Sequence, residues 1–384
     1  MRRFALAVTV VLCPCVIAAG DWPRFRGPQG NGFTPEKLSL LPKPRKLWSK
    51  DVGRGNASLV VSKGKAYTVG YRKDRGSVVV SCFDATTGRD VWERKIHSGG
   101  SDSSPVLVGD KLYVLCHLGK PTLRCLRAGD GKEVWARELP GPKGGDRAYG
   151  HTGSPLPWED LIILNVGRGA AIDGKTGKIA WQHDGLPGLA TPVLYRDNKT
   201  RRPCVLIFAG KELIARDARS GRELWSLPWK TEIAVNAADP IYHDGRVFIT
   251  TTYGKHAAVF DVSTGRPEQV WKTEGSAFSS GFRWMDHVFC FTGDSFSCLE
   301  FHGGKRKWRQ LYAGGGSVIV AGDKIILLNS TGHLWIAPLS TAGFRPVIDQ
   351  KVHGGVTWTP PSLADGRLYV RNKEGLVVCL QIGR

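Results

Sequence analysis

The chain has 384 residues, of which 41% are hydrophobic and 23% charged, and this composition is typical of a folded globular protein rather than a disordered one. Lysine and arginine outnumber aspartate and glutamate by 54 to 34, so the net charge of +20 favours anionic partners. Glycine contributes 48 residues without a Gly-X-Y period, which excludes a collagen-like helix. The length alone predicts two or three domains, but the many glycines and the 13 tryptophans favour one architecture with repeated tight turns.

The first twenty residues have the pattern of a signal peptide. Arg2 and Arg3 precede an apolar run of 14 residues (4–17), and three small residues (18–20) follow it. The run is too short to span a bilayer, and Pro14 interrupts it. We therefore predict that residues 1–20 are a signal peptide cleaved before Asp21, which leaves a soluble, exported chain with a net charge of +18 and no membrane span.

Two other interpretations of this segment stay open. The apolar run could remain attached as an N-terminal anchor, or Cys13 or Cys15 could carry a lipid. Lipid attachment is disfavoured because Leu12 and Pro14 stand directly before these cysteines, where a lipid-attachment motif has a small residue. The predicted location is periplasmic or extracellular.

One motif recurs along the rest of the chain. A short apolar stretch ends in a polar residue, a glycine follows four positions later, and a tryptophan stands four positions after that, as in Asp84, Gly88 and Trp92. From Trp48 onward, the tryptophans of this motif are separated by 44, 43, 46, 44, 46 and 37 residues. A period of this length with several short strands per unit is typical of a β-propeller. We expect the polar residue and glycine to form a turn and the tryptophans to pack between adjacent blades.

Each repeat also begins in the same way. A serine, threonine or aspartate followed by proline opens a strand, as at Ser104-Pro105 and Ser154-Pro155, because proline at the first position of a strand removes no essential ladder hydrogen bond. A hairpin turn and an alternating strand follow, as in residues 108–114. One unit is therefore predicted to be a blade of four antiparallel strands.

The count of these units predicts eight blades. Six end at tryptophans, and residues 317–347 are predicted to form a seventh in which Phe344 replaces the tryptophan. Residues 359–382 supply three strands of the eighth blade, and residues 45–48 supply the fourth, so that the N-terminal strand closes the ring. We predict an all-β, eight-bladed β-propeller of four-stranded antiparallel blades over residues 45–384, preceded by an N-terminal lead segment at 21–44. Seven blades are the alternative.

Seven cysteines follow residue 20, an odd number. Four of them share one position of the repeat with alanine and valine residues of other blades, which predicts a small buried packing site and inert free thiols. These four are Cys82, Cys125, Cys298 and Cys379. A disulfide between Cys290 and Cys298, which flank a hairpin turn, is the alternative. No cysteine or histidine pattern has zinc spacing, and we predict no catalytic, cofactor-binding or metal-binding residue.

The loops that cross from the outer strand of one blade to the inner strand of the next are expected near the central channel, and function concentrates on such loops. The longest insertion, at 140–153, belongs to this set. We predict that five residues of these loops line one funnel mouth and form a binding site. They are Asp102, Tyr149, His151, Asn236 and Trp358. Basic residues are otherwise dispersed through turns, without the aromatic and basic groove of a nucleic-acid-binding protein.

The Asp-x-x-x-Gly-x-x-x-Trp repeat resembles that of pyrroloquinoline-quinone (PQQ) type propellers and of BamB-like propellers, which act in outer-membrane assembly. Residues 21–28 are similar to a segment found ahead of such propellers in secreted bacterial proteins. PQQ dehydrogenases of this family carry a disulfide between adjacent cysteines, a calcium site and long added segments. This sequence has no Cys-Cys pair and no matching calcium motif, so the resemblance implies a quinoprotein-like propeller without PQQ or calcium.

The resemblance favours an exported, non-catalytic propeller that acts as a protein-binding or scaffold module of the cell envelope. Its expected partners are proteins or anionic envelope components, in line with the basic charge. Two other functions stay open, because one propeller architecture hosts many activities: a PQQ-dependent alcohol or sugar oxidoreductase, and a module that binds extracellular polysaccharide. We expect a monomer without specific nucleic-acid binding.

Overall fold

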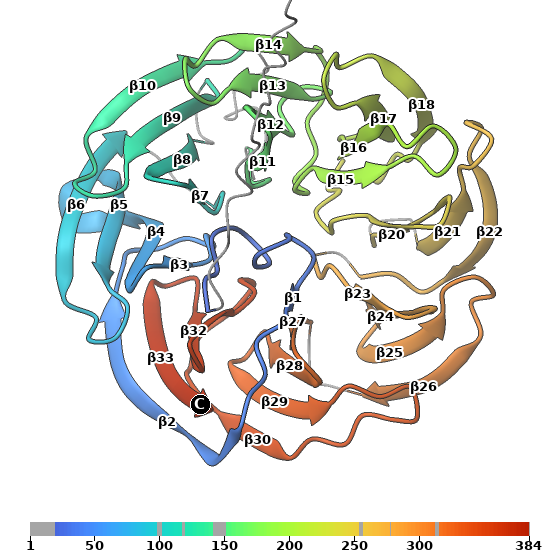
Figure 1. Cartoon of the computed structure of the whole chain (residues 1–384). Coiled ribbons are helices and arrows are strands. Elements are labelled where there is room, and N and C mark those ends of the chain that lie inside the picture. The colour runs from blue at the N-terminus through green and yellow to red at the C-terminus, as the bar shows by residue number, and fades with distance from the viewer. Residues whose placement is uncertain are drawn as a thin grey trace, which may run out of the picture.

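Eight antiparallel sheets surround a central channel in the computed structural model (Figure 1). The structure describes residues 20–97, 102–116, 120–140, 151–252, 256–276, 278–311 and 315–383, so all of the predicted signal peptide except Gly20 lies outside the described residues. The predicted eight-bladed, all-β propeller is confirmed, and the alternative with seven blades is wrong. In the described ranges, no helix combines the length and the apolar character that crossing a membrane requires.

Each blade runs from an inner strand at the channel to an outer strand at the rim. The first four blades are β3(Val60–Ser62), β4(Lys65–Arg72), β5(Ser77–Asp84) and β6(Asp90–His97); β7(Val106–Val108), β8(Lys111–Cys116), β9(Thr122–Arg127) and β10(Glu133–Glu138); β11(Leu156–Trp158), β12(Leu161–Leu164), β13(Ala170–Asp173) and β14(Ile179–Gln182); and β15(Val193–Arg196), β16(Pro203–Phe208), β17(Glu212–Asp217) and β18(Glu223–Pro228). A single 3-10 turn, η1(Lys73–Arg75), joins β4 to β5.

The other four blades follow the same order. They are β19(Ile241–His243), β20(Arg246–Thr250), β21(Ala257–Asp261) and β22(Glu268–Thr273); β23(Phe282–Trp284), β24(His287–Thr292), β25(Ser295–Glu300) and β26(Arg306–Leu311); β27(Gly316–Ala321), β28(Lys324–Asn329), β29(His333–Pro338) and β30(Ile348–Lys351); and β31(Ser362–Ala364), β32(Arg367–Arg371), β33(Leu376–Gly383) and β2(Leu40–Asp51). A short strand, β1(Phe33–Thr34), extends the seventh blade at its inner edge.

The tryptophan of an outer strand lies opposite the small residue of the neighbouring strand in its own blade. Trp92 pairs with Cys82, and Trp181 pairs with Ala171, each next to a register shift of the ladder. The indole Nε1 of Trp92 then donates to the carbonyl of Ala128 in the next blade at 3.0 Å. The tryptophans therefore join adjacent blades, as predicted, and the small residues leave room for the indole.

The polar residue and the glycine of the repeat form a turn, and the tryptophan of the preceding blade packs onto it. Asp84 Oδ1 accepts hydrogen bonds from the Thr87 backbone N at 2.7 Å and from Thr87 Oγ1 at 2.8 Å, and these bonds lower the pKa of Asp84. Gly88 has φ +73°, and a Cβ at this position would lie 2.9 Å from the ring of Trp48 in the preceding blade. Glycine thus serves both the backbone conformation and the contact with the indole.

All seven cysteines of the described residues are buried and free. Cys290 pairs with Ser297 and Cys298 with Phe289 in the β24–β25 ladder, so the alternative disulfide is not formed. Burial raises the pKa of the Cys125 thiol to about 11 and of the Cys379 thiol to about 12. The prediction of inert packing thiols is therefore consistent with their surroundings.

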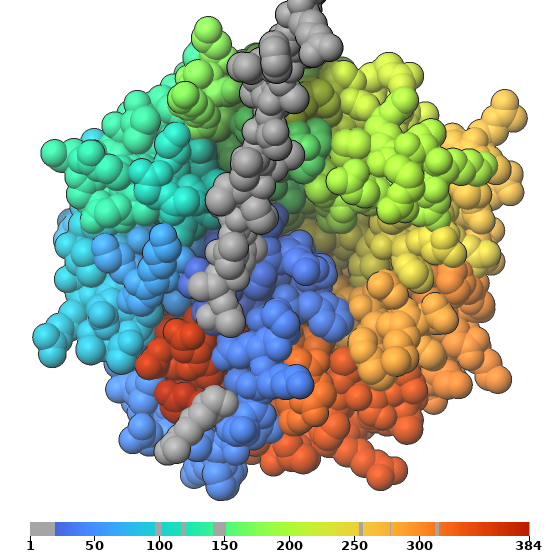
Figure 2. Space-filling model, viewed as in Figure 1, coloured from blue at the N-terminus to red at the C-terminus, as the bar shows by residue number. Residues whose placement is uncertain are grey.

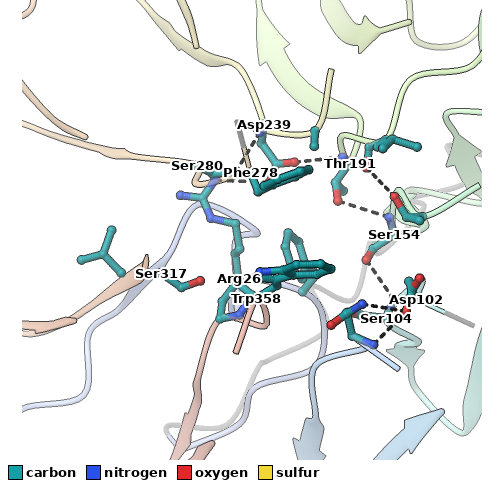
Figure 3. A pocket seen from close by; sticks show the side chains of 17 residues that line it. Arg26, Asp102, Ser104, Ser154, Thr191, Asp239, Phe278, Ser280, Ser317 and Trp358 are labelled. Carbon is teal, nitrogen blue, oxygen red and sulfur yellow. Dashed lines mark hydrogen bonds and ion pairs between the residues drawn. The ribbon is translucent and has the colours of Figure 1, made fainter. Parts of the chain in front are cut away.

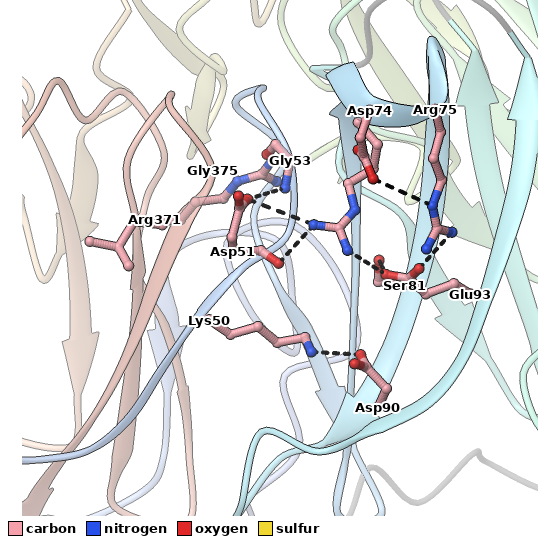
Figure 4. Close-up of polar contacts among 12 residues, drawn as sticks. Lys50, Asp51, Gly53, Asp74, Arg75, Ser81, Asp90, Glu93, Arg371 and Gly375 are labelled. Atoms are coloured by element: carbon pink, nitrogen blue, oxygen red, sulfur yellow. Dashed lines mark hydrogen bonds and ion pairs between the residues drawn. The ribbon is translucent and has the colours of Figure 1, made fainter.

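The two ends of the chain close the ring. β2 pairs with β33 in antiparallel register as the outer strand of the eighth blade, which confirms the predicted closure, and it extends beyond the predicted residues 45–48 to Leu40–Asp51. The seam to the first blade is shown in Figure 4, where Lys50 pairs with Asp90 at 2.6 Å.

A buried arginine also crosses this seam. Arg371, at the end of β32, donates hydrogen bonds of 2.6–2.9 Å to the carbonyls of Ala57, Val69 and Gly53 and to Thr68 Oγ1. Burial lowers the pKa of Arg371 to about 10, so the guanidinium is cationic at neutral pH. One side chain of the eighth blade thereby fixes four backbone and side-chain acceptors at the edge of the first.

The seventh blade departs from the prediction. Phe344 lies in the connection between β29 and β30, outside any strand, and its ring contacts Trp308 and Phe296 of the sixth blade, with centroids 6.2 and 5.9 Å apart. The prediction that Phe344 replaces the outer-strand tryptophan is therefore wrong. The phenylalanine instead helps to form the surface that receives Trp308, whose Nε1 donates to Ser340 O at 3.3 Å.

The N-terminal lead segment crosses one end of the channel, as the blue chain in Figures 1 and 2 shows. Trp22 is fully buried and exchanges two backbone hydrogen bonds with Val61 on β3, and β1 runs parallel to β27. These contacts are with the later residues of the inner strands, whereas the crossing loops lead into their first residues. The lead segment therefore covers the end of the channel opposite to the predicted funnel mouth.

Candidate binding site in the central channel

Hydrogen bonds link the starts of the inner strands around the channel. The backbone N of Ser104 donates to Ser154 Oγ at 3.2 Å, and the backbone N of Ser154 donates to Thr191 Oγ1 at 3.2 Å. The backbone N of Thr191 donates to Asp239 Oδ1 at 2.9 Å. The series continues to Ser58 on one side and to Ser280 on the other. The residue before each strand-opening proline therefore joins neighbouring blades.

A buried ion pair anchors the lead segment inside the channel. Arg26 Nη1 lies 3.3 Å from Asp239 Oδ2, and both side chains are almost fully buried. Arg26 also donates to the carbonyls of Gly281 and Asn31. Burial lowers the pKa of Arg26 and raises that of Asp239, while their mutual attraction opposes both changes. The two opposite charges therefore compensate each other, and neither is free to bind a ligand. The pair forms the floor of the channel cavity described next.

A cavity of about 150 Å³ lies above this floor, and Figure 3 shows it from close by. Phe25 and Arg26 of the lead segment line it on one side, and residues that lead into the inner strands line the rest. Side-chain oxygens of Ser154, Thr191 and Asp239 in this lining accept the hydrogen bonds that link neighbouring blades. The cavity combines these polar atoms with the apolar side chains of Leu189 and Phe278.

Two exposed aromatic rings stand at the mouth. Trp358 and Phe278 are 47% and 39% exposed, and their rings stack with centroids 5.9 Å apart and planes 20° apart. Lys373 Nζ lies 5.6 Å from the centroid of the Trp358 ring. Large aromatic side chains with this exposure are common anchors of protein interfaces.

The structure brings together some of the predicted site residues. Asp102 and Trp358 both line the cavity, and Asp102 Oδ1 accepts hydrogen bonds from the backbone and side chain of Asn56 at 2.8 and 3.0 Å. His151 is buried, next to the lining residue Thr152. That these residues bind a partner stays a prediction.

Of the other two predicted residues, the structure describes one, and it belongs to the wall of the channel. Asn236 is fully buried, and its Nδ2 donates to Ala209 O at 2.7 Å and to Trp229 O at 3.4 Å, so it stabilises the wall. Tyr149 lies outside the described residues.

Sequence reasoning missed three residues that shape this cavity. Arg26 could not be placed, because nothing in the sequence of the lead segment indicates that it enters the channel. Asp239 precedes Pro240 at a strand start that recurs in other blades. Because the position follows the repeat, nothing in the sequence indicated that Asp239 pairs with Arg26. Phe278 belongs to a crossing loop, and its stacking on Trp358, 80 residues later, depends on the ring geometry.

A second cavity, of about 520 Å³, lies at the opposite end of the channel, between residues of the lead segment and the inner strands β11, β15, β19 and β23. Arg24, Arg196 and Arg283 line it, and among the described residues its lining contains no aspartate or glutamate. Burial lowers the pKa of Arg24, but a guanidinium stays protonated in proteins. This groove is therefore cationic and favours anionic groups.

Comparisons with known proteins agree with this architecture. The profile of a family described as "Outer membrane protein assembly factor BamB" matches residues 74–310, more than half of the chain. BamB from Burkholderia pseudomallei is 24% identical over 403 residues, which cover 98% of this chain and 97% of that protein. Tetrathionate hydrolase from Acidithiobacillus ferrooxidans is 28% identical over 215 residues, which cover 48% of this chain and 39% of the hydrolase. The chain thus spans about two fifths of that relative.

Solved structures show the same fold. BamB from Moraxella catarrhalis has a TM-score of 0.67 at 17% identity, covering 88% of this chain and 98% of that one. The quinohemoprotein alcohol dehydrogenase ADHIIG from Pseudomonas putida has a TM-score of 0.67 at 14% identity, covering 95% of this chain and 80% of that one. At these identities the likeness concerns the fold alone, because one propeller architecture hosts different activities.

Proposed function

Because the chain belongs to the family of the outer membrane protein assembly factor BamB, we propose that it is a protein-binding scaffold of the cell envelope rather than an enzyme. The alignment with a BamB protein over nearly the full length of both chains supports this role. The two arginines at the N-terminus, followed by an apolar run, support export to the envelope. The observation that carries the proposal is the exposed aromatic pair at the channel mouth.

The mouth has the properties of a small protein interface. Phe278 and Trp358 offer apolar area, and the cavity beneath them accepts an apolar side chain of a partner loop. Asp102 and Asn56 hydrogen-bond to each other at the rim. Interfaces commonly combine a central aromatic anchor with a polar rim. The predicted residues Asp102 and Trp358 are therefore proposed as partner-contacting residues, and His151 as a residue that supports them.

Site-specific photocrosslinking in cells tests this proposal. A photoreactive phenylalanine analogue replaces Trp358 in one variant and Leu311 in the control, because Leu311 is 63% exposed on the outer strand β26 and does not line the channel cavity. We expect crosslinks to defined envelope proteins from position 358 and none of these from position 311. Identical crosslinked products from both positions would contradict a partner-binding mouth.

A quinone cofactor fits this channel poorly. The cavity of about 150 Å³ is smaller than the roughly 300–1,000 Å³ of ordinary ligand pockets. Arg26 is already paired with Asp239, and Asp102 Oδ1 already accepts two hydrogen bonds, so a polycarboxylate quinone and a calcium ion would have to displace existing partners. We propose no reaction through PQQ or calcium. If the protein reduced a redox dye with an alcohol or a sugar after PQQ and calcium had been added, the proposal of a non-catalytic scaffold would be overturned.

The cationic groove beside the lead segment supports anionic partners as a second part of the proposal. Besides Arg26, which is paired with Asp239, three arginines line this groove, and its lining contains no described carboxylate. Attraction to acidic proteins or other anionic envelope components should therefore fall with ionic strength. The wild-type chain, when immobilised, should therefore retain fewer envelope proteins at moderate salt than at low salt. This decrease should be smaller for the double variant with Arg196→Gln and Arg283→Gln.

A further inference from the structure

Two histidines and one aspartate converge at the junction of the fifth and sixth blades. His243 ends β19, Asp286 lies in the turn between β23 and β24, and His302 lies in the turn between β25 and β26. One possible ligand atom from each lies within 4.8 Å of the other two, and His243 Nε2 is 3.7 Å from Asp286 Oδ1. No other such group of three occurs among the described residues.

We propose that His243, Asp286 and His302 bind a divalent transition-metal ion, with Zn²⁺ as the best match. Imidazole nitrogens and a carboxylate are common ligands of Zn²⁺, at about 2.0–2.2 Å from the ion, which places tetrahedral ligand atoms about 3.4 Å apart. The 3.7 Å between His243 and Asp286 is close to this spacing. Three protein ligands leave one position for water or for a group of a partner.

The backbone around these side chains is fixed by contacts that do not involve the proposed ion. The backbone N of Phe301 donates to the carbonyl of Asp286 at 2.7 Å, which joins the two turns that carry Asp286 and His302. Arg246 Nη1 donates to the carbonyl of His302 at 2.9 Å. The His243 ring packs edge-on against the fully buried Phe301, with centroids 5.6 Å apart. The side chains therefore need only small rotations to bind one ion.

The equivalent positions in another pair of blades have different chemistry. At the junction of the third and fourth blades, Trp158 stands where His243 does, and Arg219 stands where His302 does. The Arg219 guanidinium lies over the Trp158 ring at 4.8 Å and pairs with Asp160 at 2.5 Å. At this junction the two positions hold neighbouring blades together with a cation. At the junction of the fifth and sixth blades, the two imidazoles carry no positive charge unless they bind a metal ion or a proton.

The charges of the group suit a divalent cation, because two imidazoles in their neutral form bind a metal through nitrogen. Asp286 is exposed and supplies the negative charge of the group.

Titration of the tag-free full chain with Co²⁺ and Zn²⁺ tests the proposal. We expect one ion per chain, visible absorption bands of low-symmetry Co²⁺ that Zn²⁺ abolishes, and a Zn²⁺-dependent rise in the melting temperature. His243→Ala and His302→Ala should each weaken binding by about 10-fold or more, and the double variant should abolish the bands. Both side chains are partly exposed, so circular dichroism and the metal-free melting temperature should stay close to wild type.

His333→Ala is the matched control. His333 forms a hydrogen-bonded pair with Asp349 on the seventh blade, but this pair belongs to no group of three possible ligands among the described residues. Its loss should leave Co²⁺ binding unchanged. Absence of stoichiometric binding by wild type, unchanged binding in the double variant, or an equal loss in His333→Ala would each overturn the proposal.

Discussion

Replacement of Arg371 by methionine should weaken the closure of the ring. Arg371 is fully buried at the seam between the eighth and first blades, and its guanidinium supplies the hydrogen bonds to Gly53, Ala57, Thr68 and Val69. Figure 4 shows this arginine on its strand, next to Gly53. Methionine keeps much of the length of the side chain but removes every donor.

The magnitude follows from what the substitution leaves unpaired. A buried acceptor without a donor costs about 1–3 kcal/mol, so four acceptors set an upper limit of roughly 12 kcal/mol. The loss stays below this limit because Thr68 Oγ1 still donates to the Ala57 carbonyl at 3.3 Å. The neutral side chain recovers part of this, because the burial that lowers the pKa of Arg371 from 12.5 to about 10 corresponds to about 3 kcal/mol of desolvation. Relaxation around the site reduces the loss further. We expect the free energy of unfolding to fall by about 3–5 kcal/mol, as when a buried charged network is broken.

Urea denaturation followed by tryptophan fluorescence measures this loss. Arg367→Met is the control, because Arg367 stands on the same strand but forms only a 4.0 Å ion pair with the exposed Asp365, and such pairs contribute about 0–1 kcal/mol. A loss below 1 kcal/mol in Arg371→Met, or one equal to that of the control, would refute the view that Arg371 fixes the seam.

Other predictions concern the turns, the thiols and a buried histidine. Gly221→Ala should lower the free energy of unfolding by about 2–4 kcal/mol in urea denaturation, because φ is +71° and the new Cβ would lie 2.5 Å from the Trp181 ring; Gly129→Ala, with nothing within 4 Å, should cost less than about 1 kcal/mol. The seven cysteines that follow residue 20 are buried and free. In a chain without residues 1–20, a thiol-reactive dye at pH 8 should therefore label none of them in the folded protein and all seven after denaturation. Rapid labelling of the folded chain would contradict their burial. Burial lowers the pKa of His353 below 6.5, so the unfolded chain binds the proton first and stability falls as the pH drops through that value; His353→Gln should reduce the fall in melting temperature between pH 7 and pH 5.

The repeat allowed the sequence to predict the architecture in detail. The spacing of the tryptophans reports the blade period directly, and the small residue opposite each of them is visible as an exchange of cysteine, alanine and valine at one position. Both signals are local, because each repeat forms its own sheet. The prediction for Phe344 was wrong for the same reason. Its distance along the chain matched the position of an outer strand, but its ring contacts Trp308 of the neighbouring blade.

The candidate sites could be predicted only in part, because they depend on contacts between blades. Asp102 and Trp358 were found from their crossing loops, while Arg26 reaches Asp239 across 213 residues of sequence. His243, Asp286 and His302 have no zinc-like spacing, since the end of one strand and two turns on two blades bring them together. Asn236 was chosen for its loop position, yet its amide satisfies buried carbonyls of the wall.

The pairing of β2 with β33 also constrains when the chain can finish folding. Leu40 pairs with Gly383, so β2, the first strand of the ring to be synthesised, can pair only after β33, the last strand, has been synthesised. At about 5–20 residues per second, synthesis of the intervening chain takes roughly 20 to 70 seconds. During that time β2 has no β33 to pair with, and the face of the first blade that packs against the eighth lacks its neighbour. A nascent chain of this protein therefore has a long interval in which unpaired strands must be kept from other chains.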